Sequence, residues 1–323
     1  MLLSTACAYN VTAANKELDE AALNAFMDEL VDSHNFERAQ LASTFQQARY
    51  RQPVIDAISR PAEKLDWYRY KGIFLTEGRI NAGVEYWQNN RNTLERAEEK
   101  YGVPAEIIVA IIGIETRYGT NKGRYRVVDS LATLAFHYPK RSKFFRSELK
   151  QFLLLAREQD VDPLNIKGSY AGAMGVPQFI SSSYRHYAVD FDGDDYIDLW
   201  NNHVDAIGSV ANYFSEHGWQ SGEPVIYPVE KAPTNISSNV QDGLKPAANY
   251  GDLQSAGIQV AADLAPERQV ALLEFRERDG EAYWLGLRNF YVITRYNHSQ
   301  LYALAAYRLA QEIRSRYTQQ ASN

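Results

Sequence analysis

The sequence is poor in several features that mark common protein classes. It has one cysteine, Cys7, so a disulfide within the chain and a multi-cysteine metal site are both excluded. Its longest apolar run, 107–114, is far shorter than the roughly 20 residues that a membrane-spanning helix needs. The net charge is −6 and no dense basic run occurs, which argues against a nucleic-acid partner.

The signatures of several enzyme classes are also missing. The six histidines form no His-Glu-x-x-His zinc motif. No Gly-x-Ser-x-Gly nucleophile elbow surrounds Ser169, and loops that cradle phosphate are absent. These absences exclude the familiar patterns of zinc proteases, serine hydrolases and nucleotide-binding enzymes.

What is present predicts a mainly helical, α+β protein with more than one domain. The chain has 323 residues, of which 45% are apolar and 23% charged, enough to bury two or three cores. Apolar residues recur at three and four over 18–33 and 36–48, which is typical of helices. Between 222 and 279, proline, glycine and asparagine become frequent, and the runs 224–229 and 270–275 favour strands.

These patterns predict a domain organisation. We expect a signal remnant and linker first, then a helical domain, then the functional core, and then a small β-containing segment that returns to the cleft. A C-terminal helix joins the helical domain, and an acidic loop belongs to the core. The predicted ranges are 1–14, 15–102, 103–220 with its loop at 190–205, 221–298, and the helix at 299–323.

The position of Cys7 resembles the end of a lipoprotein signal. Small residues precede it in Met1-Leu-Leu-Ser-Thr-Ala-Cys7, as they precede a cysteine that is lipidated after cleavage. The basic and most of the apolar parts of such a signal are missing, and Ser4 stands where an aliphatic residue is usual. The alternative is an incidental cysteine. The signal hypothesis predicts lipidation at Cys7 and an outer-membrane lipoprotein that faces the periplasm.

A buried helix leads to Glu115. Pro104 suits the first helical position and Gly119 suits the residue past the helix end, while the residues between them are apolar on every side. Burial and the negative end of the helix dipole both favour the neutral acid, so we expect a raised pKa for Glu115. Glycosidic cleavage needs such an acid, still protonated near neutral pH. The alternative is a buried ion pair with a nearby arginine: Arg117, Arg124 or Arg126.

An acidic loop follows at 190–198. Its carboxylates stand at alternate positions, as in the EF-hand loop that surrounds calcium with oxygen atoms. Gly193 falls at the fourth loop position instead of the sixth, and Asn201 instead of glutamate stands at the twelfth. The loop is therefore either a calcium site or a solvated acidic turn.

Three segments carry a family resemblance. They are Gly-Ile-Glu-Thr-Arg-Tyr-Gly at 113–119, Gly-Ser-Tyr-Ala-Gly-Ala-Met-Gly-Val-Pro-Gln-Phe at 168–179, and Asn-Phe-Tyr-Val-Ile-Thr-Arg-Tyr-Asn-His at 289–298. Together they resemble the lytic murein transglycosylase B family, over about residues 65–307. The resemblance implies a lysozyme-like helical core with an N-terminal helical domain, and an enzyme whose partner is the glycan strand of peptidoglycan.

The resemblance also implies the residues of the site. Glu115 is the single catalytic acid/base, and the small residues of 168–175 let a sugar approach the backbone. A tight loop between helices is the alternative for that segment. The residues implied to hold the glycan or to orient Glu115 are Tyr70, Ser169, Gln178, Tyr213, Tyr296, Asn297 and Tyr302. Some family members bind calcium in an acidic loop, and the implied ligands here are Asp190, Asp192, Asp194, Tyr196 and Asp205.

The implied reaction uses neither water nor a cofactor. Glu115 protonates the oxygen between N-acetylmuramic acid and N-acetylglucosamine, then takes the proton of the sugar's C6 hydroxyl as a 1,6-anhydro ring closes. A hydrolytic muramidase instead needs a second carboxylate, for which Asp129 and Glu148 are candidates. A non-catalytic peptidoglycan-binding protein and a calcium sensor are two further hypotheses for the function. We expect a monomer with at most a structural calcium ion.

Overall fold

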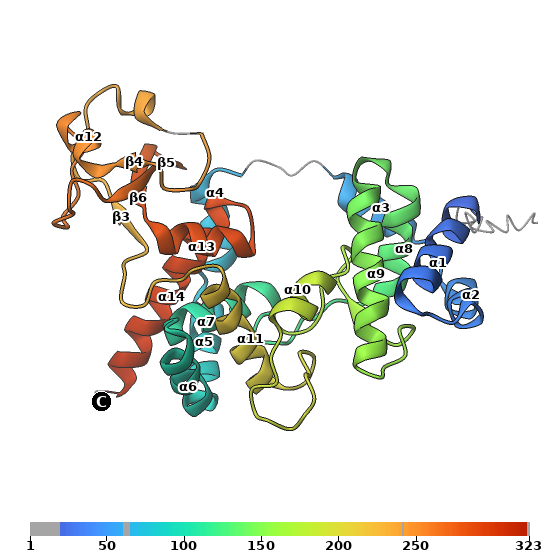
Figure 1. Ribbon diagram of the computed structural model, residues 1–323. Coiled ribbons are helices and arrows are strands. Elements are labelled where there is room, and N and C mark those ends of the chain that lie inside the picture. Colours follow the sequence, from blue (N-terminus) through green and yellow to red (C-terminus); the bar gives the residue numbers. More distant parts are fainter. Residues whose placement is uncertain (1–19, 61–64, 241, 322–323) are drawn as a thin grey trace, which may run out of the picture. The chain divides into compact units, whose positions relative to one another are not determined.

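The computed structural model describes residues 20–60, 65–240 and 242–321 (Figure 1). The predicted signal remnant at 1–14 and the predicted lipidation site Cys7 lie outside the described residues. Within the residues that are described, no helix is both long and apolar enough to cross a membrane.

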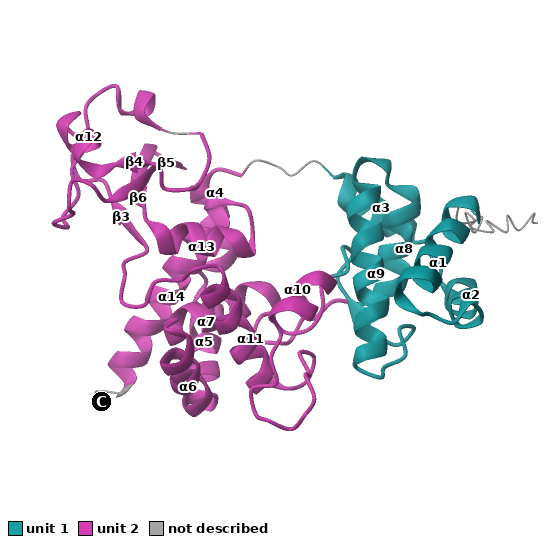
Figure 2. Cartoon of the chain, viewed as in Figure 1, with its two compact units in different colours: residues 1–60, 124–172 teal, residues 61–123, 173–323 magenta. Residues whose placement is uncertain are grey.

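Contacts divide the chain into two compact units, which Figure 2 colours separately. The chain enters each unit twice, so these units differ from the domains predicted at 15–102 and 103–220. Periodicity locates helices along the chain, but it does not show which distant helices pack together. Unit 1 consists of residues 1–60 and 124–172, and unit 2 of residues 61–123 and 173–323.

Unit 1 is built from helices and a short ribbon. Helices α8 and α9 pack against each other, and α8 is buried from Val127 to Ala135. The helices are α1 (Glu20–His34), α2 (Arg38–Gln47), α3 (Gln52–Ser59), α8 (Val127–His137) and α9 (Ser142–Glu158), with a 3-10 turn at Pro139–Arg141. The ribbon pairs β1 (Tyr125–Arg126) with β2 (Lys167–Gly168) antiparallel.

Unit 2 surrounds one apolar helix, α7, with other helices. Every residue of α7 from Ile107 to Gly113 is buried, and α7 contacts α5, α6, α11 and α14, which surround it in Figure 1. A helix that is apolar on every side is thus in the core, as predicted. The helices are α4 (Trp67–Phe74), α5 (Glu77–Asn89), α6 (Arg91–Tyr101), α7 (Ala105–Thr116), α10 (Ser181–Tyr187), α11 (His203–Glu216), α12 (Tyr250–Ser255), α13 (Arg288–Tyr296) and α14 (Gln300–Ala321).

Unit 2 also contains a four-stranded antiparallel sheet, in the order β3-β6-β5-β4. The strands are β3 (Ile226–Pro228), β4 (Ala248–Asn249), β5 (Gln269–Glu277) and β6 (Gly280–Gly286), and a 3-10 turn covers Ile236–Asn239. A separate apolar cluster joins Val270 and Leu285 of this sheet to residues outside it such as Ile258. The strands expected at 224–229 and 270–275 are present, whereas β6 is not among the predicted strands. The predicted mainly helical fold with a small β-containing insert is confirmed.

Candidate active site

Helix α7 carries Glu115 to its carboxyl-terminal end. Pro104 is the residue before the first helical turn, and Thr116 is the last helical residue. The predicted stop at Gly119 is wrong by two residues, because Arg117 and Tyr118 already leave the helix with φ of 49° and 59°. Glycine is therefore not what ends this helix, and tertiary contacts must hold the two residues in the left-handed region.

Contacts of Tyr118 explain this early helix end. Its hydroxyl donates to the carbonyl oxygen of Arg79 at 2.8 Å. Its ring fits against Gly83 and Gly113, where an added Cβ would lie 2.6 and 2.5 Å from the hydroxyl oxygen. Glycine at those two positions makes room for the ring, and the packed ring fixes the turn that follows Glu115.

The surroundings of Glu115 favour its neutral form. The residue is partly exposed, so its carboxyl is not sealed off from a substrate. Burial of the carboxyl group raises its pKa to about 7, whereas the hydrogen bond that it accepts from Tyr302 acts in the opposite direction. Within the described residues, no ion pair joins Glu115 to an arginine, and Arg126 pairs with Asp129 instead. The predicted direction of the pKa shift is therefore supported by burial.

Three of the predicted tyrosines lie beside this carboxyl. Tyr302 on α14 donates a hydrogen bond to Oε1 of Glu115 at 2.6 Å. Burial, and next the charge of Glu115, raise the pKa of Tyr302, of Tyr296 on α13 and of Tyr70 on α4. All three phenols stay neutral at physiological pH, and the hydroxyl of Tyr302 is the one that donates a hydrogen bond to the acid.

Hydrogen bonds join the second half of the glycine-rich segment, residues 168–179, to the end of α7 and to α13. Oγ1 of Thr116 donates to the carbonyl oxygen of Val176 at 2.9 Å, and the Tyr296 hydroxyl donates to that of Pro177 at 2.5 Å. Gln178 has a φ of 52°, and its side-chain amide donates to the carbonyl oxygens of Gly175 and Lys122 at 2.9 and 3.3 Å. The predicted residue Gln178 thus braces this loop, with its carbonyl group left as an acceptor.

The other predicted glycan-binding residues lie in different settings. Tyr213 is 7% exposed, donates to the carbonyl oxygen of Arg295 at 2.6 Å and stacks on His217, so it supports neighbouring residues. Asn297 follows α13 and is exposed. Ser169 belongs to unit 1, where its Oγ accepts a hydrogen bond from the amide of Ala171.

Three carboxylates of the acidic loop converge. Oxygen atoms of Asp190, Asp192 and Asp194 lie within 4.8 Å of one another. Asp205 is fully buried, and its two oxygens accept hydrogen bonds from the amides of Phe191 and Asp198. Tyr196, further along the loop, is 39% exposed. The first three residues therefore provide an all-oxygen set of the kind that calcium prefers, and Asp205 holds the loop from within.

The two carboxylates considered for a hydrolytic mechanism both belong to unit 1 and are buried. Asp129 is fully buried, and its oxygens form ion pairs of 2.7 Å with Arg51 and Arg126. It also accepts a hydrogen bond from the amide of Arg49. Through these contacts Asp129 stabilises unit 1.

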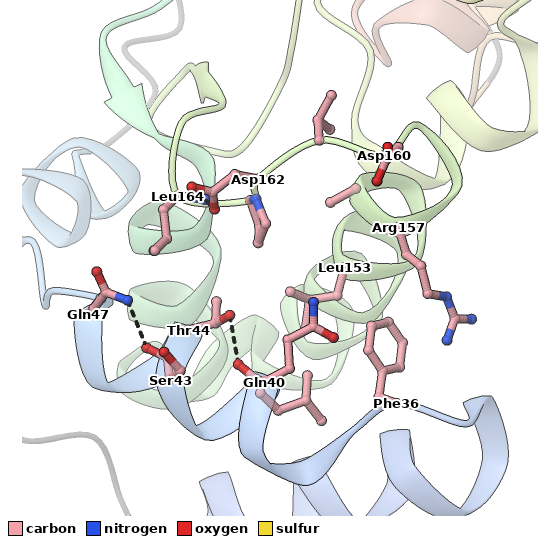
Figure 3. A pocket seen from close by; sticks show the side chains of 14 residues that line it. Phe36, Gln40, Ser43, Thr44, Gln47, Leu153, Arg157, Asp160, Asp162 and Leu164 are labelled. Carbon is pink, nitrogen blue, oxygen red and sulfur yellow. Dashed lines mark hydrogen bonds between the residues drawn. The ribbon is translucent and has the colours of Figure 1, made fainter.

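Unit 1 also contains a hollow of about 550 Å³ between α2 and the loop that follows α9 (Figure 3). None of the predicted site residues lines it. The labelled side chains are Phe36, Gln40, Ser43, Thr44 and Gln47 on one wall and Leu153, Arg157, Asp160, Asp162 and Leu164 on the other. The residues that surround Glu115 are therefore the better candidate for the active site.

Three residues beside the site were not predicted from the sequence: Thr116, Tyr118 and His203. Thr116 and Tyr118 belong to the segment 113–119, so the family-like motif there could have indicated both residues. His203 packs on Gly119, and its Nδ1 is hydrogen-bonded to the Tyr86 hydroxyl at 2.9 Å. Its burial lowers its pKa, which makes it a neutral packing partner.

An acid whose pKa is raised to about 7, with phenols beside it and an adjacent backbone loop, is suited to cleaving glycosidic bonds by proton transfer. The model of the transglycosylase SLT domain family matches residues 19–311. The chain therefore belongs to the SLT-domain transglycosylases, and the predicted family resemblance is confirmed. It is a lytic transglycosylase.

Individual relatives agree with this assignment. The membrane-bound lytic murein transglycosylase B of Escherichia coli K12 is 44% identical over 89% of this chain and 81% of its own length. The crystal structure of the soluble lytic transglycosylase SltB1 from Pseudomonas aeruginosa is 50% identical, with a TM-score of 0.87 over 91% of this chain and 99% of that one. The Escherichia coli transglycosylase Slt35, crystallised with calcium, is 43% identical, with a TM-score of 0.86 over 92% and 94%.

Proposed function

We propose that this enzyme cleaves the β-1,4 bond between N-acetylmuramic acid and N-acetylglucosamine in peptidoglycan and leaves a 1,6-anhydro end. The observation that carries the proposal is the environment of Glu115, a carboxyl with a pKa of about 7 hydrogen-bonded to Tyr302. A group with this pKa can both give and take a proton near neutral pH, which one residue must do if it is acid and then base.

The reaction then has two proton transfers through the same carboxyl. Neutral Glu115 donates its proton to the glycosidic oxygen as the bond from that oxygen to C1 breaks. The substrate's own N-acetyl group stabilises the positive C1 centre. The carboxylate of Glu115 next takes the proton of the C6 hydroxyl, and the C6 oxygen bonds to C1. The hydrogen bond from Tyr302 stabilises the carboxylate between these two steps.

The tyrosines beside Glu115 give the glycan a partly apolar surface. Tyr70 and Tyr296 combine a ring for sugar packing with a neutral hydroxyl. Asn297 is exposed and can hydrogen-bond the substrate. Tyr213 stabilises the backbone next to Tyr296 through its hydrogen bond to the carbonyl oxygen of Arg295. Gln178, also in unit 2, belongs to the proposed set of glycan-binding residues, and the family resemblance adds Ser169 of unit 1.

We also propose that the acidic loop binds calcium through Asp190, Asp192, Asp194 and Tyr196, with Asp205 ordering the loop. The convergence of three carboxylates supports this, as does the calcium complex of the Escherichia coli relative Slt35. The ion would stabilise the loop and takes no part in the two proton transfers. It is therefore a structural ion in this proposal.

The cellular setting completes the proposal. A relative is named as membrane-bound, and the sequence around Cys7 resembles a lipidation site. We propose a monomer that Cys7 anchors to the outer membrane, with the catalytic units facing the periplasm and its peptidoglycan strands.

Mass spectrometry of the muropeptides released from purified peptidoglycan tests the function. The wild type should release anhydromuramyl ends, and Glu115→Gln, which keeps the shape of the side chain, should release none. Hydrated reducing ends from the wild type would identify a muramidase instead. Release by neither protein, with binding retained, would identify a non-catalytic peptidoglycan-binding protein.

A further inference from the structure

One buried hydroxyl holds the end of the catalytic helix. Thr116 is the last residue of α7 and is 1% exposed. Its Oγ1 donates to the carbonyl oxygen of Val176 at 2.9 Å and accepts a hydrogen bond from the amide of Gly119 at 2.9 Å. The hydroxyl thus joins the residue after Glu115 to the following turn and to the glycine-rich loop.

The turn needs this support because its backbone is strained. Arg117 and Tyr118 have positive φ, which costs energy in residues that carry a Cβ. Gly119 has a φ of 86° and packs on His203, where an added Cβ would lie 2.9 Å from Cε1. Without the Thr116 hydroxyl, the amide of Gly119 loses its partner and the strained turn loses one of its anchors.

The partner of Thr116 is itself held from the opposite side. The amide of Val176 donates to the carbonyl oxygen of Leu199 at 2.7 Å. Gly175 lies so close to the same carbonyl that an added Cβ would be 2.5 Å from its oxygen. Leu199 follows the acidic loop, so a chain of backbone contacts runs from that loop through Val176 to Thr116.

We infer that Thr116 is a positioning residue, whose hydroxyl sets where Glu115 stands relative to residues 173–178, the part of the glycine-rich segment that belongs to unit 2. The inference rests on the proposed function, because it concerns the same site. The titratable groups that face Glu115 are Tyr70 on α4, Tyr296 on α13 and Tyr302 on α14. Thr116 acts on the acid through the backbone and not through these phenols.

Thr116→Val, which removes only the hydroxyl at nearly constant shape, tests the inference on purified peptidoglycan. We expect kcat to fall on the order of 100-fold, the loss that a displacement of about 1 Å causes between reacting groups, with a smaller change in KM. The basic limb of the pH profile should move to lower pH, because water that enters a loosened site reduces the burial that raises the pKa of Glu115. Thr116→Ser keeps the hydroxyl and should retain most of the activity and the original pH profile.

The matched control is Thr44→Val in unit 1. Thr44 is also a buried threonine, and its Oγ1 donates to the carbonyl oxygen of Gln40 at 3.0 Å. This variant should keep kcat and the pH profile of the wild type. Circular dichroism establishes that each variant is folded, and Thr116→Ala replaces Thr116→Val if the valine variant does not fold.

The outcomes separate the inference from the proposed function. If the wild type forms anhydro ends while the Thr116→Val variant keeps its kcat and pH profile, the inference alone is overturned. Equal losses in the Thr116→Val and Thr44→Val variants would also overturn it, because the effect would then be general destabilisation. A wild type that forms no anhydro ends overturns the proposed function and the inference together.

Discussion

Tyr302 donates a hydrogen bond of 2.6 Å to Oε1 of Glu115, joining residues that stand 187 positions apart in the sequence. The two residues lie on α14 and α7, helices that pack along each other in unit 2. The bond favours the carboxylate and so opposes the burial that raises the pKa of Glu115. The balance between burial and this one hydroxyl sets the acidity of Glu115, the proposed catalytic group.

Removing the Tyr302 hydroxyl should therefore make Glu115 a weaker acid. A hydrogen bond to a charged group contributes about 1.5–3 kcal/mol, which corresponds to about one to two pH units. In Tyr302→Phe we expect the basic limb of the kcat/KM profile to move to higher pH by that amount. Lower kcat should accompany the shift, because the carboxylate that acts as base is less stabilised.

The control for this variant is Tyr296→Phe. Tyr296 also lies beside Glu115, but its hydroxyl donates to the carbonyl oxygen of Pro177. The Tyr296→Phe variant should leave the basic limb near its wild-type position. If the basic limb of the Tyr302→Phe variant moves to lower pH, the Tyr302 hydroxyl does not lower the pKa of Glu115 and the prediction is wrong.

Glu115 should also make stability depend on pH. Its pKa is about 7 in the fold against 4.5 in the unfolded chain, so the fold holds this proton more tightly. Below pH 4.5 the carboxyl group is neutral in the folded and the unfolded chain. As the pH rises to about 7, the unfolded chain ionises first, so the group increasingly lowers the free energy of unfolding; this loss is the penalty of burying Glu115. The penalty reaches roughly 3 kcal/mol at most, and partial exposure reduces it.

Glu115→Gln removes this penalty, so the variant should be more stable than the wild type at about pH 8 and nearly equal to it at about pH 4. Urea unfolding of both proteins at the two pH values measures the difference in free energy of unfolding. A Glu115→Gln variant that is less stable than the wild type at about pH 8 would contradict this prediction, because it would show that the fold does not disfavour the carboxylate of Glu115.

Much of this arrangement follows from the sequence alone. The apolar residues of α7 predict a buried helix, and a carboxyl at its end predicts a raised pKa. The run 224–229 is rich in β-branched residues and proline, and the run 270–275 is mostly apolar; the sheet contains residues 226–228 of the first run and all of the second. These features depend on neighbours in the chain, which is why local patterns reveal them.

Other features depend on partners that local patterns cannot specify. Tyr70 and Tyr302 reach Glu115 from α4 and α14, and only the family resemblance indicated them among 22 tyrosines. The end of α7 is set by the packing of Tyr118 on Gly83, a residue of another helix. The two units likewise form from segments far apart in the chain.

Calcium should stabilise the protein through the acidic loop. An ion at about 100 times its Kd adds about 2.7 kcal/mol to the free energy of unfolding, so calorimetry should show a higher Tm in calcium than in a chelator. Asp192→Asn removes one of the three convergent carboxylates and should lose most of this increase. Asp195→Asn, an exposed change in the same loop but outside the cluster, should retain it. Equal increases in both variants would contradict the proposed ligands.

We propose that Glu115 transfers protons to and from the sugar and that water takes no part. The most direct test is digestion of purified peptidoglycan in water labelled with heavy oxygen, followed by mass spectrometry of the new muramyl ends. We expect anhydro ends, each one water lighter than a reducing end and free of label. Reducing ends that carry the heavy oxygen would contradict the proposal, because they would show that water and a second catalytic group complete the reaction.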